Sequence, residues 1–252
     1  MVSCHGTMDC GSAMEKVTKA KEFEKNLVHG KGIIPTPNSW IDNFWTVHRN
    51  KVVASLRMPF QQASTVLFIG VGTGDVIPKL NPSGKRIIGI DLNKTYLDQA
   101  ALYCEPILGD GSTLPLENES CDLVVCNMVL HHIVEQGGLE QTLSEAARVL
   151  RPGGRFMAYE PNIYHPSGMA LTLLNAFRLY HIVGGGSNYE RALSPFSLVR
   201  ACRPYFKTAR VQTLTLGHPR FPIAVQNMLF RLDSPCAALY PFSFSFSIEA
   251  VK

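Results

Sequence analysis

The sequence has few charged residues, and it lacks the patterns of several large classes of protein. Asp, Glu, Lys and Arg make up 17% of the 252 residues, whereas about a quarter is usual in soluble proteins. The chain contains no basic run and no interleaving of aromatic and basic residues, so we expect no nucleic-acid partner. It also contains no run of about 18 apolar residues, so we expect no helix that spans a membrane.

The cysteines do not form a recognisable framework. All seven stand at irregular spacings, and no C-x-x-C pair occurs. The sequence therefore predicts neither a set of disulfides nor a zinc ribbon, and we expect no metal site. Residues 1–12 are polar and contain no apolar signal-peptide core. These absences together predict a protein of the reducing cytoplasm.

An apolar run that ends in three glycines is the most informative feature that is present. Residues 65–69 have the pattern of a buried parallel strand, and Gly70, Gly72 and Gly74 follow at alternate positions. Glycines at this place permit positive φ and let a ligand lie against bare backbone. A dinucleotide-binding G-x-G-x-x-G would need its third glycine at position 75, which is Asp75. The spacing favours a nucleoside-type cofactor without a pyrophosphate, and a tight turn that binds nothing is the alternative.

From residue 65 onward strands and helices alternate, which predicts an α/β fold with a parallel sheet. Apolar patterns and turn signals predict strands at about 65–69, 86–90, 106–108, 122–127, 155–159, 208–216 and 242–248. The corresponding helices are predicted at about 13–30, 39–57, 94–103, 139–150, 166–183 and 195–203. We expect the first two helices to form a cap, and Trp40 or Trp45 lining a substrate pocket is the alternative.

Polar residues stand at the carboxyl ends of successive predicted strands, where open α/β sheets bind their ligands. Asp91 follows the second strand and Asp110 follows the third. Asn127 ends the fourth strand, and Glu160 follows the fifth. A single acidic residue after a strand is more often a cap or a turn former. Several at neighbouring strand ends favour a binding site.

These motifs together resemble the class I S-adenosylmethionine-dependent methyltransferases, in particular the small-molecule branch that includes quinone-biosynthesis-like enzymes. The resemblance covers about residues 66–160 and rests on the order of five motifs: the glycine loop, Asp91, Gly109-Asp110 with Leu114-Pro115-Leu116, the run 127–132 and the run 148–154. It implies a doubly wound Rossmann-like fold with a seven-stranded, mostly parallel sheet, an antiparallel last strand and a helical cap. We expect the cap over residues 1–60 and a catalytic domain over 61–252, with a helical substrate-side insertion at about 162–205.

The resemblance implies S-adenosyl-L-methionine as the cofactor and a small-molecule acceptor that receives the methyl group by in-line displacement. It assigns Gly70, Gly72, Gly74 and Asn127 to the methionine part of the cofactor, Asp91 to the ribose, and Leu92, Asp110 and Gly111 to the adenine. One departure is visible. The family commonly has an acidic residue two positions before the first glycine, and this chain has Phe68 there.

Methyl transfer requires a base only when the acceptor must lose a proton. Candidates follow the fourth and fifth strands: His131, His132, Glu160, Tyr164 and His165. Packing or helix capping is the alternative role for either member of the histidine pair. The apolar helix predicted at 166–183 and the aromatic cap favour an acceptor with a hydrophobic portion, such as a lipid, a glycan precursor or a secondary metabolite.

Two other functions stay open. One is a catalytically idle methyltransferase-like domain that binds a partner through apolar surfaces, an alternative that Phe68 keeps open. The other is an NAD-dependent oxidoreductase, against which the glycine spacing argues. Peripheral contact of residues 169–183 with a membrane is a further alternative, although burial of that helix is favoured.

Overall fold

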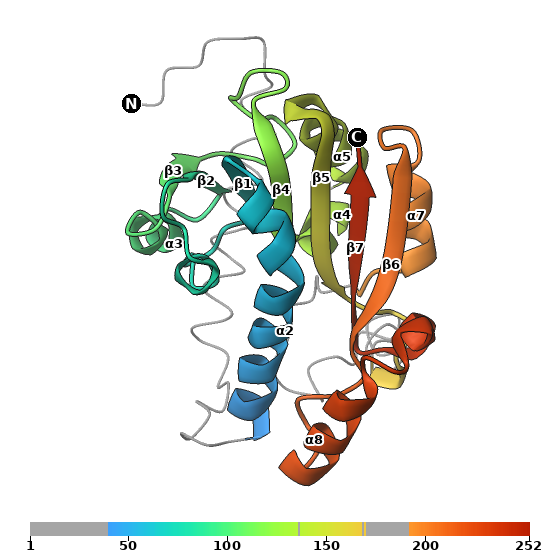
Figure 1. Ribbon diagram of the computed structural model, residues 1–252. Helices are drawn as coiled ribbons and strands as arrows, with labels where there is room; N and C mark the ends of the chain where they lie inside the picture. Colours follow the sequence, from blue (N-terminus) through green and yellow to red (C-terminus); the bar gives the residue numbers. More distant parts are fainter. Residues whose placement is uncertain (1–39, 136, 168, 170–191) are drawn as a thin grey trace.

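The computed structural model describes residues 40–135, 137–167, 169 and 192–252. Within them, strands form one sheet in the order β3-β2-β1-β4-β5-β7-β6 (Figure 1). The strands are β1 (Thr65–Ile69), β2 (Arg86–Asp91), β3 (Glu105–Leu108), β4 (Cys121–Asn127), β5 (Leu150–Pro161), β6 (Thr208–Thr215) and β7 (Ser245–Val251). The first five pair in parallel, and β7 lies antiparallel between β5 and β6. The predicted seven-stranded, mostly parallel fold is confirmed.

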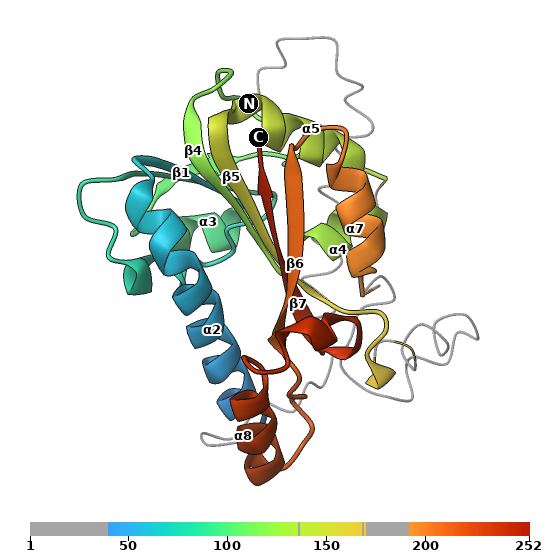
Figure 2. The same cartoon turned by 45° about the vertical axis from the view of Figure 1, so that its right-hand side comes forward.

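Helices cover both faces of this sheet. The α-helices are α2 (Trp40–Gln62), α3 (Lys94–Ala100), α4 (Leu130–Glu135), α5 (Leu139–Val149), α7 (Pro195–Cys202) and α8 (Ile223–Leu232), and the 3-10 helices are η1 (Ile77–Leu80) and η3 (Ala237–Phe242). Figure 2 shows α2 on one side of the sheet and α5 and α7 on the other. Among the described residues, none of the helices has the length and apolar character needed to cross a bilayer.

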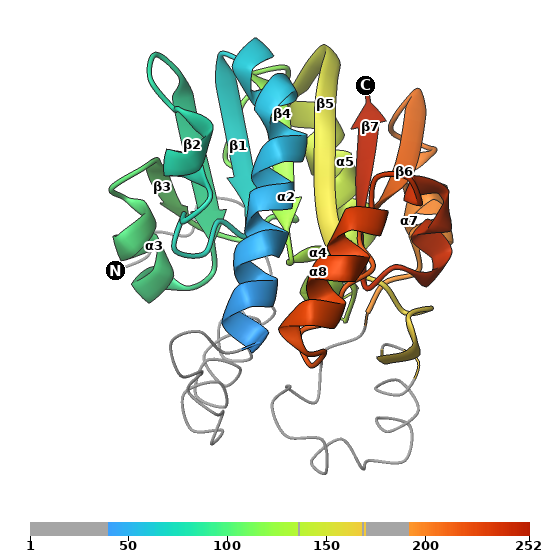
Figure 3. The same ribbon diagram turned by 60° about the horizontal axis from the view of Figure 1, so that its bottom comes forward.

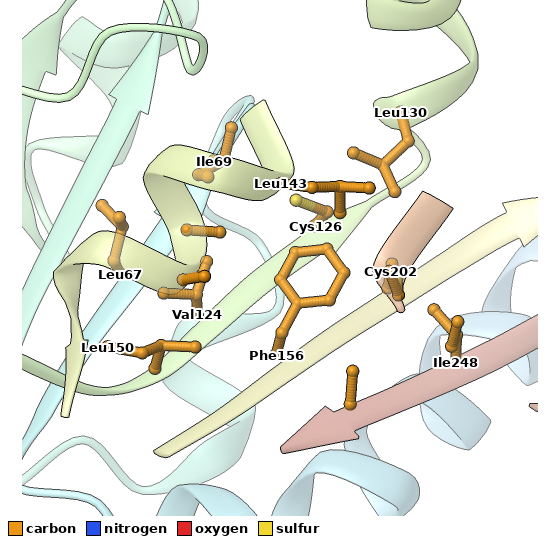
Figure 4. Close-up of a cluster of buried hydrophobic side chains, with 14 of the residues drawn as sticks. Leu67, Ile69, Val124, Cys126, Leu130, Leu143, Leu150, Phe156, Cys202 and Ile248 are labelled. Carbon is orange, nitrogen blue, oxygen red and sulfur yellow. The ribbon is translucent and has the colours of Figure 1, made fainter. Parts of the chain in front are cut away.

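The apolar strands are buried on both faces because alternate residues divide between two cores. On β4, Leu123 and Val125 pack toward α2, whereas Val124 and Cys126 pack toward α5 and α7. Figure 4 shows the second of these cores around Phe156, which is fully buried. This double burial explains why the central strands have continuous apolar runs. Because β1 to β5 pair in parallel, their carboxyl ends lie at one end of the sheet.

Some of the predicted helices and strands agree with the structure, one differs, and others lie outside the described residues. The helix predicted at 39–57 begins at Trp40 and continues to Gln62. The predicted helix at 13–30 and nearly all of that at 166–183 lie outside the described residues. The last strand begins at Ser245, so its predicted start at Phe242 was wrong: Phe242 belongs to η3 and is 65% exposed. The proposed domain boundary near residue 60 stays a prediction.

His48 is a buried histidine in α2, with an exposed fraction of 2%. Burial, together with the neighbouring positive charges of Arg49 and Lys51, lowers its pKa to about 4, and burial is the largest cause. Between pH 6.5 and about 4, the unfolded chain therefore binds a proton that the folded protein does not. The free energy of unfolding must decrease as the pH falls through this range.

We expect His48 to contribute up to about 1.4 kcal/mol per pH unit to that decrease. Urea unfolding of the wild type and of His48→Leu, measured from pH 7 to pH 4, checks this expectation. The variant lacks the titrating ring, so its free energy of unfolding should fall less steeply with decreasing pH. Equal slopes for the two proteins would contradict the assignment.

Candidate functional site

A cavity of about 520 Å³ lies at the carboxyl ends of the parallel strands. Its volume is within the range of about 300–1,000 Å³ that is usual for small-molecule sites. The eight residues predicted to bind a cofactor all line it: Gly70, Gly72, Gly74, Asp91, Leu92, Asp110, Gly111 and Asn127. The structure therefore brings these residues together at one site. Their individual contacts with a cofactor stay predictions.

The glycine loop forms one wall of the cavity. Gly70, Gly72 and Gly74 all have positive φ, with values of 65°, 55° and 73°. A Cβ atom at Gly70 would collide with the side chain of Val129, so this glycine lets β1 pack against the segment after β4. A Cβ atom at Gly72 would meet nothing within 4 Å. The backbone at Gly72 is therefore open to a ligand.

Asp91 connects the end of β2 to this loop. Its Oδ2 accepts a hydrogen bond from the Gly72 N–H at 2.8 Å, and its Oδ1 accepts one from the Asn93 N–H at 2.9 Å. Burial raises the pKa of Asp91, and these backbone N–H groups oppose that shift. A carboxylate has about four acceptor positions, so this fixed group can still accept hydrogen bonds from a ligand.

Other polar groups reach the cavity from β3 and β4. Asp110 follows β3, and its Oδ1 accepts a hydrogen bond from the Ser112 N–H at 2.9 Å. The Oδ1 atom of Asn127 is buried and has no hydrogen-bond partner among the described residues. A buried acceptor without a partner is rare in native structures. Asn127 also lines the cavity, so its side chain is a candidate to bind a ligand there.

The side chain of Phe68 does not fill the cavity. This side chain is 5% exposed and packs in the core beneath α2, together with Val52, Leu56 and Val125. Phe68 also forms part of the cavity wall. The wall is therefore apolar at the position where the resemblance suggests an acidic residue.

The four candidate catalytic residues lie in three different surroundings. His131 Nδ1 and Glu160 Oε2 lie 2.6 Å apart in a buried pair, and neither residue lines the cavity. His165 also lies away from the wall, where its ring stacks on that of His218 with the ring centres 5.5 Å apart. Of the four, His132 alone lines the cavity. The catalytic role of each stays a prediction.

His132 is held as a neutral ring. Burial and, to a smaller extent, the adjacent His131 lower its pKa to about 3. The two rings are in contact, with centres 4.0 Å apart. At neutral pH His132 therefore carries no charge, but its ring can form a hydrogen bond with a ligand.

Other residues of the wall were not predicted from the sequence, among them Tyr96, Met128 and Ile133. A signal was available for two of them. Tyr96 stands in the first turn of the helix that follows β2, where Asn93 caps the helix and accepts from the Tyr96 N–H at 3.2 Å. Ile133 stands in the first turn after β4. Helix N-termini after strands lie at the same sheet edge as the glycine loop, so both positions were candidates.

Comparison with known proteins gives one family match and many relatives. Residues 67–158 match the family described as methyltransferase domain. A probable S-adenosylmethionine-dependent methyltransferase of Mycolicibacterium smegmatis is 33% identical over 139 residues, which are 54% of this chain and 52% of that protein. A demethylmenaquinone methyltransferase of Symbiobacterium thermophilum is 31% identical over 114 residues, which are 40% of this chain and 44% of that protein. The chain thus spans about half the length of these relatives.

A solved structure resembles nearly the whole chain. It is a protein of Thermotoga maritima described as a SAM-dependent methyltransferase and possible histamine N-methyltransferase. The TM-score is 0.61 at 17% sequence identity, and the match covers 94% of this chain and 97% of that one. At this identity the likeness shows the fold alone.

Proposed function

Because the chain belongs to the class I S-adenosylmethionine-dependent methyltransferase family, we propose that it transfers a methyl group to a small-molecule acceptor with a hydrophobic portion. One observation carries this proposal: the eight residues that the family resemblance assigns to the cofactor all line a single cavity. The methyl donor of this family is S-adenosyl-L-methionine, which supplies an activated methyl group on a positively charged sulfur.

The residues of the cavity fit this cofactor. Gly72 offers open backbone, and the carboxylate of Asp91 is already oriented to accept from the two ribose hydroxyls. Asp110 is an acceptor for the adenine amino group at another strand end. The unpartnered Oδ1 of Asn127 is an acceptor for the amino group of the methionine part. Phe68 leaves that end without a carboxylate, so Asn127 would be the main acceptor there.

Methyl transfer by in-line displacement depends mostly on positioning the acceptor and excluding water. His132 supports this view of the site. With a pKa of about 3, its ring is a weak base at neutral pH but a good hydrogen-bond partner for an acceptor hydroxyl or amine. We therefore assign His132 to orienting the acceptor, and the reaction does not depend on His132 as a base.

The hydrophobic portion of the acceptor is supported by apolar residues of the cavity wall, among them Leu56, Phe68 and Ile133. The name of the demethylmenaquinone methyltransferase relative supports a small-molecule acceptor in general. A cytoplasmic location completes the proposal. It is supported by the described cysteines, which are free thiols, as a reducing compartment requires.

Calorimetric titration with S-adenosylhomocysteine tests the cofactor assignment without knowledge of the acceptor. We expect saturable heat with one site per chain and a dissociation constant in the micromolar range. A parallel fluorescence titration with NADH should show no binding, because a dinucleotide-binding loop needs a glycine at position 75, which is Asp75 here. No heat at high micromolar S-adenosylhomocysteine would contradict the proposal, and binding without turnover across a wide acceptor panel would favour an idle domain.

A further inference from the structure

The segment between β6 and β7 is a long insertion between two paired strands, and its helices were not predicted from the sequence. It lies at the same end of the sheet as the cavity. Thr215, the last residue of β6, pairs with Ser245, the first residue of β7. Pro161, the last residue of β5, pairs with Ser245 as well. The chain therefore leaves the sheet before residue 216 and re-enters it after residue 244, in both cases at the end of the sheet where the parallel strands have their carboxyl ends. Residues 216–244 contain α8 and η3.

One face of α8 is fixed to α2, beside which it lies in Figure 3. Gln226 is fully buried and donates hydrogen bonds from Nε2 to the carbonyl oxygens of Trp40 at 2.9 Å and Phe221 at 2.8 Å. At the end of the helix, Asp233 forms a 2.7 Å ion pair with Lys51 and is 4% exposed. These contacts fix the orientation of α8 on the protein.

The opposite face of α8 is apolar and exposed. Phe221 stands just before α8, and Val225, Met228 and Leu232 follow at spacings of four, three and four residues, which places the last three on one side of the helix. Their exposed fractions are 37%, 37%, 55% and 42%. We call these four residues with the adjacent Arg231 the α8 face. Contiguous exposed apolar side chains of this kind are typical of a surface that binds a protein, a membrane or another ligand.

The exposed charges of residues 216–244 have one sign. Residues 216–244 contain a single acidic residue, Asp233, and it is buried against Lys51. Arg220 and Arg231 are exposed on the same insertion. An anionic surface with an apolar layer beneath it complements this combination. A second copy of the chain would instead bring two faces together that both have arginine and no exposed acid.

We propose that the α8 face docks on the surface of an anionic lipid bilayer. The apolar side chains enter the region between headgroups and acyl chains, and Arg231 lies among the anionic headgroups. Docking in this way holds the carboxyl edge of the sheet near the lipid, from which a hydrophobic acceptor could reach the cavity. This role for the cavity rests on the proposed function, whereas docking itself does not. The α8 face contains none of residues 169–183, which lie almost wholly outside the described residues.

Vesicle co-sedimentation of the full chain without any methyl donor tests the proposal. We expect binding to vesicles of phosphatidylcholine with phosphatidylglycerol and much weaker binding to phosphatidylcholine alone. The double variant M228D/L232D and the variant R231E should each bind the anionic vesicles at least about tenfold more weakly. The matched control is Leu102→Asp, which changes a 79% exposed apolar side chain outside the insertion and should bind like the wild type.

Circular dichroism and thermal unfolding verify that the variants fold, which is expected because every changed side chain is exposed. Absence of vesicle binding by the wild type would overturn the proposal, as would an equal loss in Leu102→Asp. Concentration-dependent self-association that M228D/L232D abolishes, without vesicle binding, would assign the α8 face to a second copy instead. Titration with S-adenosylhomocysteine separates the two proposals, since it should be unchanged in these variants and its failure would affect the proposed function alone.

Discussion

Replacement of Asp91 by Ala is expected to weaken the binding of S-adenosylhomocysteine by at least about a hundredfold. A hydrogen bond to a charged group contributes about 1.5–3 kcal/mol, and the carboxylate is expected to accept two from the ribose. Loss of both corresponds to at least about 3 kcal/mol, or about two powers of ten in the dissociation constant. The same substitution also removes the acceptor for the Gly72 N–H, which lies 2.8 Å from Asp91 Oδ2.

Calorimetric titration of Asp91→Ala and Asp91→Asn distinguishes these two contributions. The Asn side chain retains one acceptor oxygen of similar position, so its dissociation constant should lie between those of the wild type and Asp91→Ala. Asp98→Ala is the matched control, because Asp98 is an exposed residue of α3 that pairs with Lys94. It should bind like the wild type. Affinity in Asp91→Ala within a fewfold of the wild type would remove Asp91 from the ribose site.

The strands and the position of the cavity could be predicted because both follow from local rules. Residues 66–69 and 123–126 are apolar throughout, and such short apolar runs bounded by turn residues are typical of strands buried on both faces. Once the strands are placed, the rule that ligands bind at their carboxyl ends selects Asp91 and Asn127 without knowledge of the tertiary structure.

The insertion between β6 and β7 could not be predicted in the same way, because its structure depends on contacts with a distant helix. Gln226 is polar and yet fully buried, since its amide bonds to the carbonyl of Trp40 far away in the sequence. The alternation of Phe and Ser continues back to Phe242, which extended the predicted strand too far. The ladder begins only at Ser245, because the backbone from Tyr240 to Ser243 forms the end of η3.

The different surroundings of His131 and His132 could not be predicted from sequence either. They are neighbours in α4, which has six residues, so no apolar periodicity fixes which side faces the sheet. The structure buries His131 against Glu160 and leaves His132 at the cavity. The direction of the Glu160 side chain depends on the parallel pairing of β4 with β5, which brings the start of α4 beside the end of β5.

Replacement of Glu160 by Ala is expected to lower the free energy of unfolding by about 3–5 kcal/mol, because several groups lose their hydrogen-bond acceptor at about 1–3 kcal/mol for each buried one. Glu160 is fully buried. Its Oε1 accepts hydrogen bonds from the N–H groups of Val129 at 3.1 Å and Leu130 at 2.8 Å. Its Oε2 accepts from the His131 N–H at 3.4 Å and lies 2.6 Å from His131 Nδ1. The alanine variant leaves all these groups buried without their acceptor.

The carboxylate also lies at the N-terminus of α4, where a negative charge is favoured by the free N–H groups and the helix dipole. Met128 and Val129 immediately precede this helix and line the cavity. Met128 has a φ of 56°, which is uncommon for a residue other than glycine, so the segment needs support from its surroundings. We therefore expect Glu160→Ala to weaken the binding of S-adenosylhomocysteine as well as to destabilise the fold.

Urea unfolding and calorimetric titration of three variants measure both effects. Glu160→Gln retains one acceptor oxygen and loses the charge, so it should lose about 1–2 kcal/mol of stability. Glu249→Ala, on the adjacent β7, is the matched control. It removes a half-exposed partner of Arg155 at 3.0 Å, and such pairs contribute at most about 1 kcal/mol. If Glu160→Ala were no less stable than Glu249→Ala, Glu160 would not support α4 and would again be a candidate for direct catalysis.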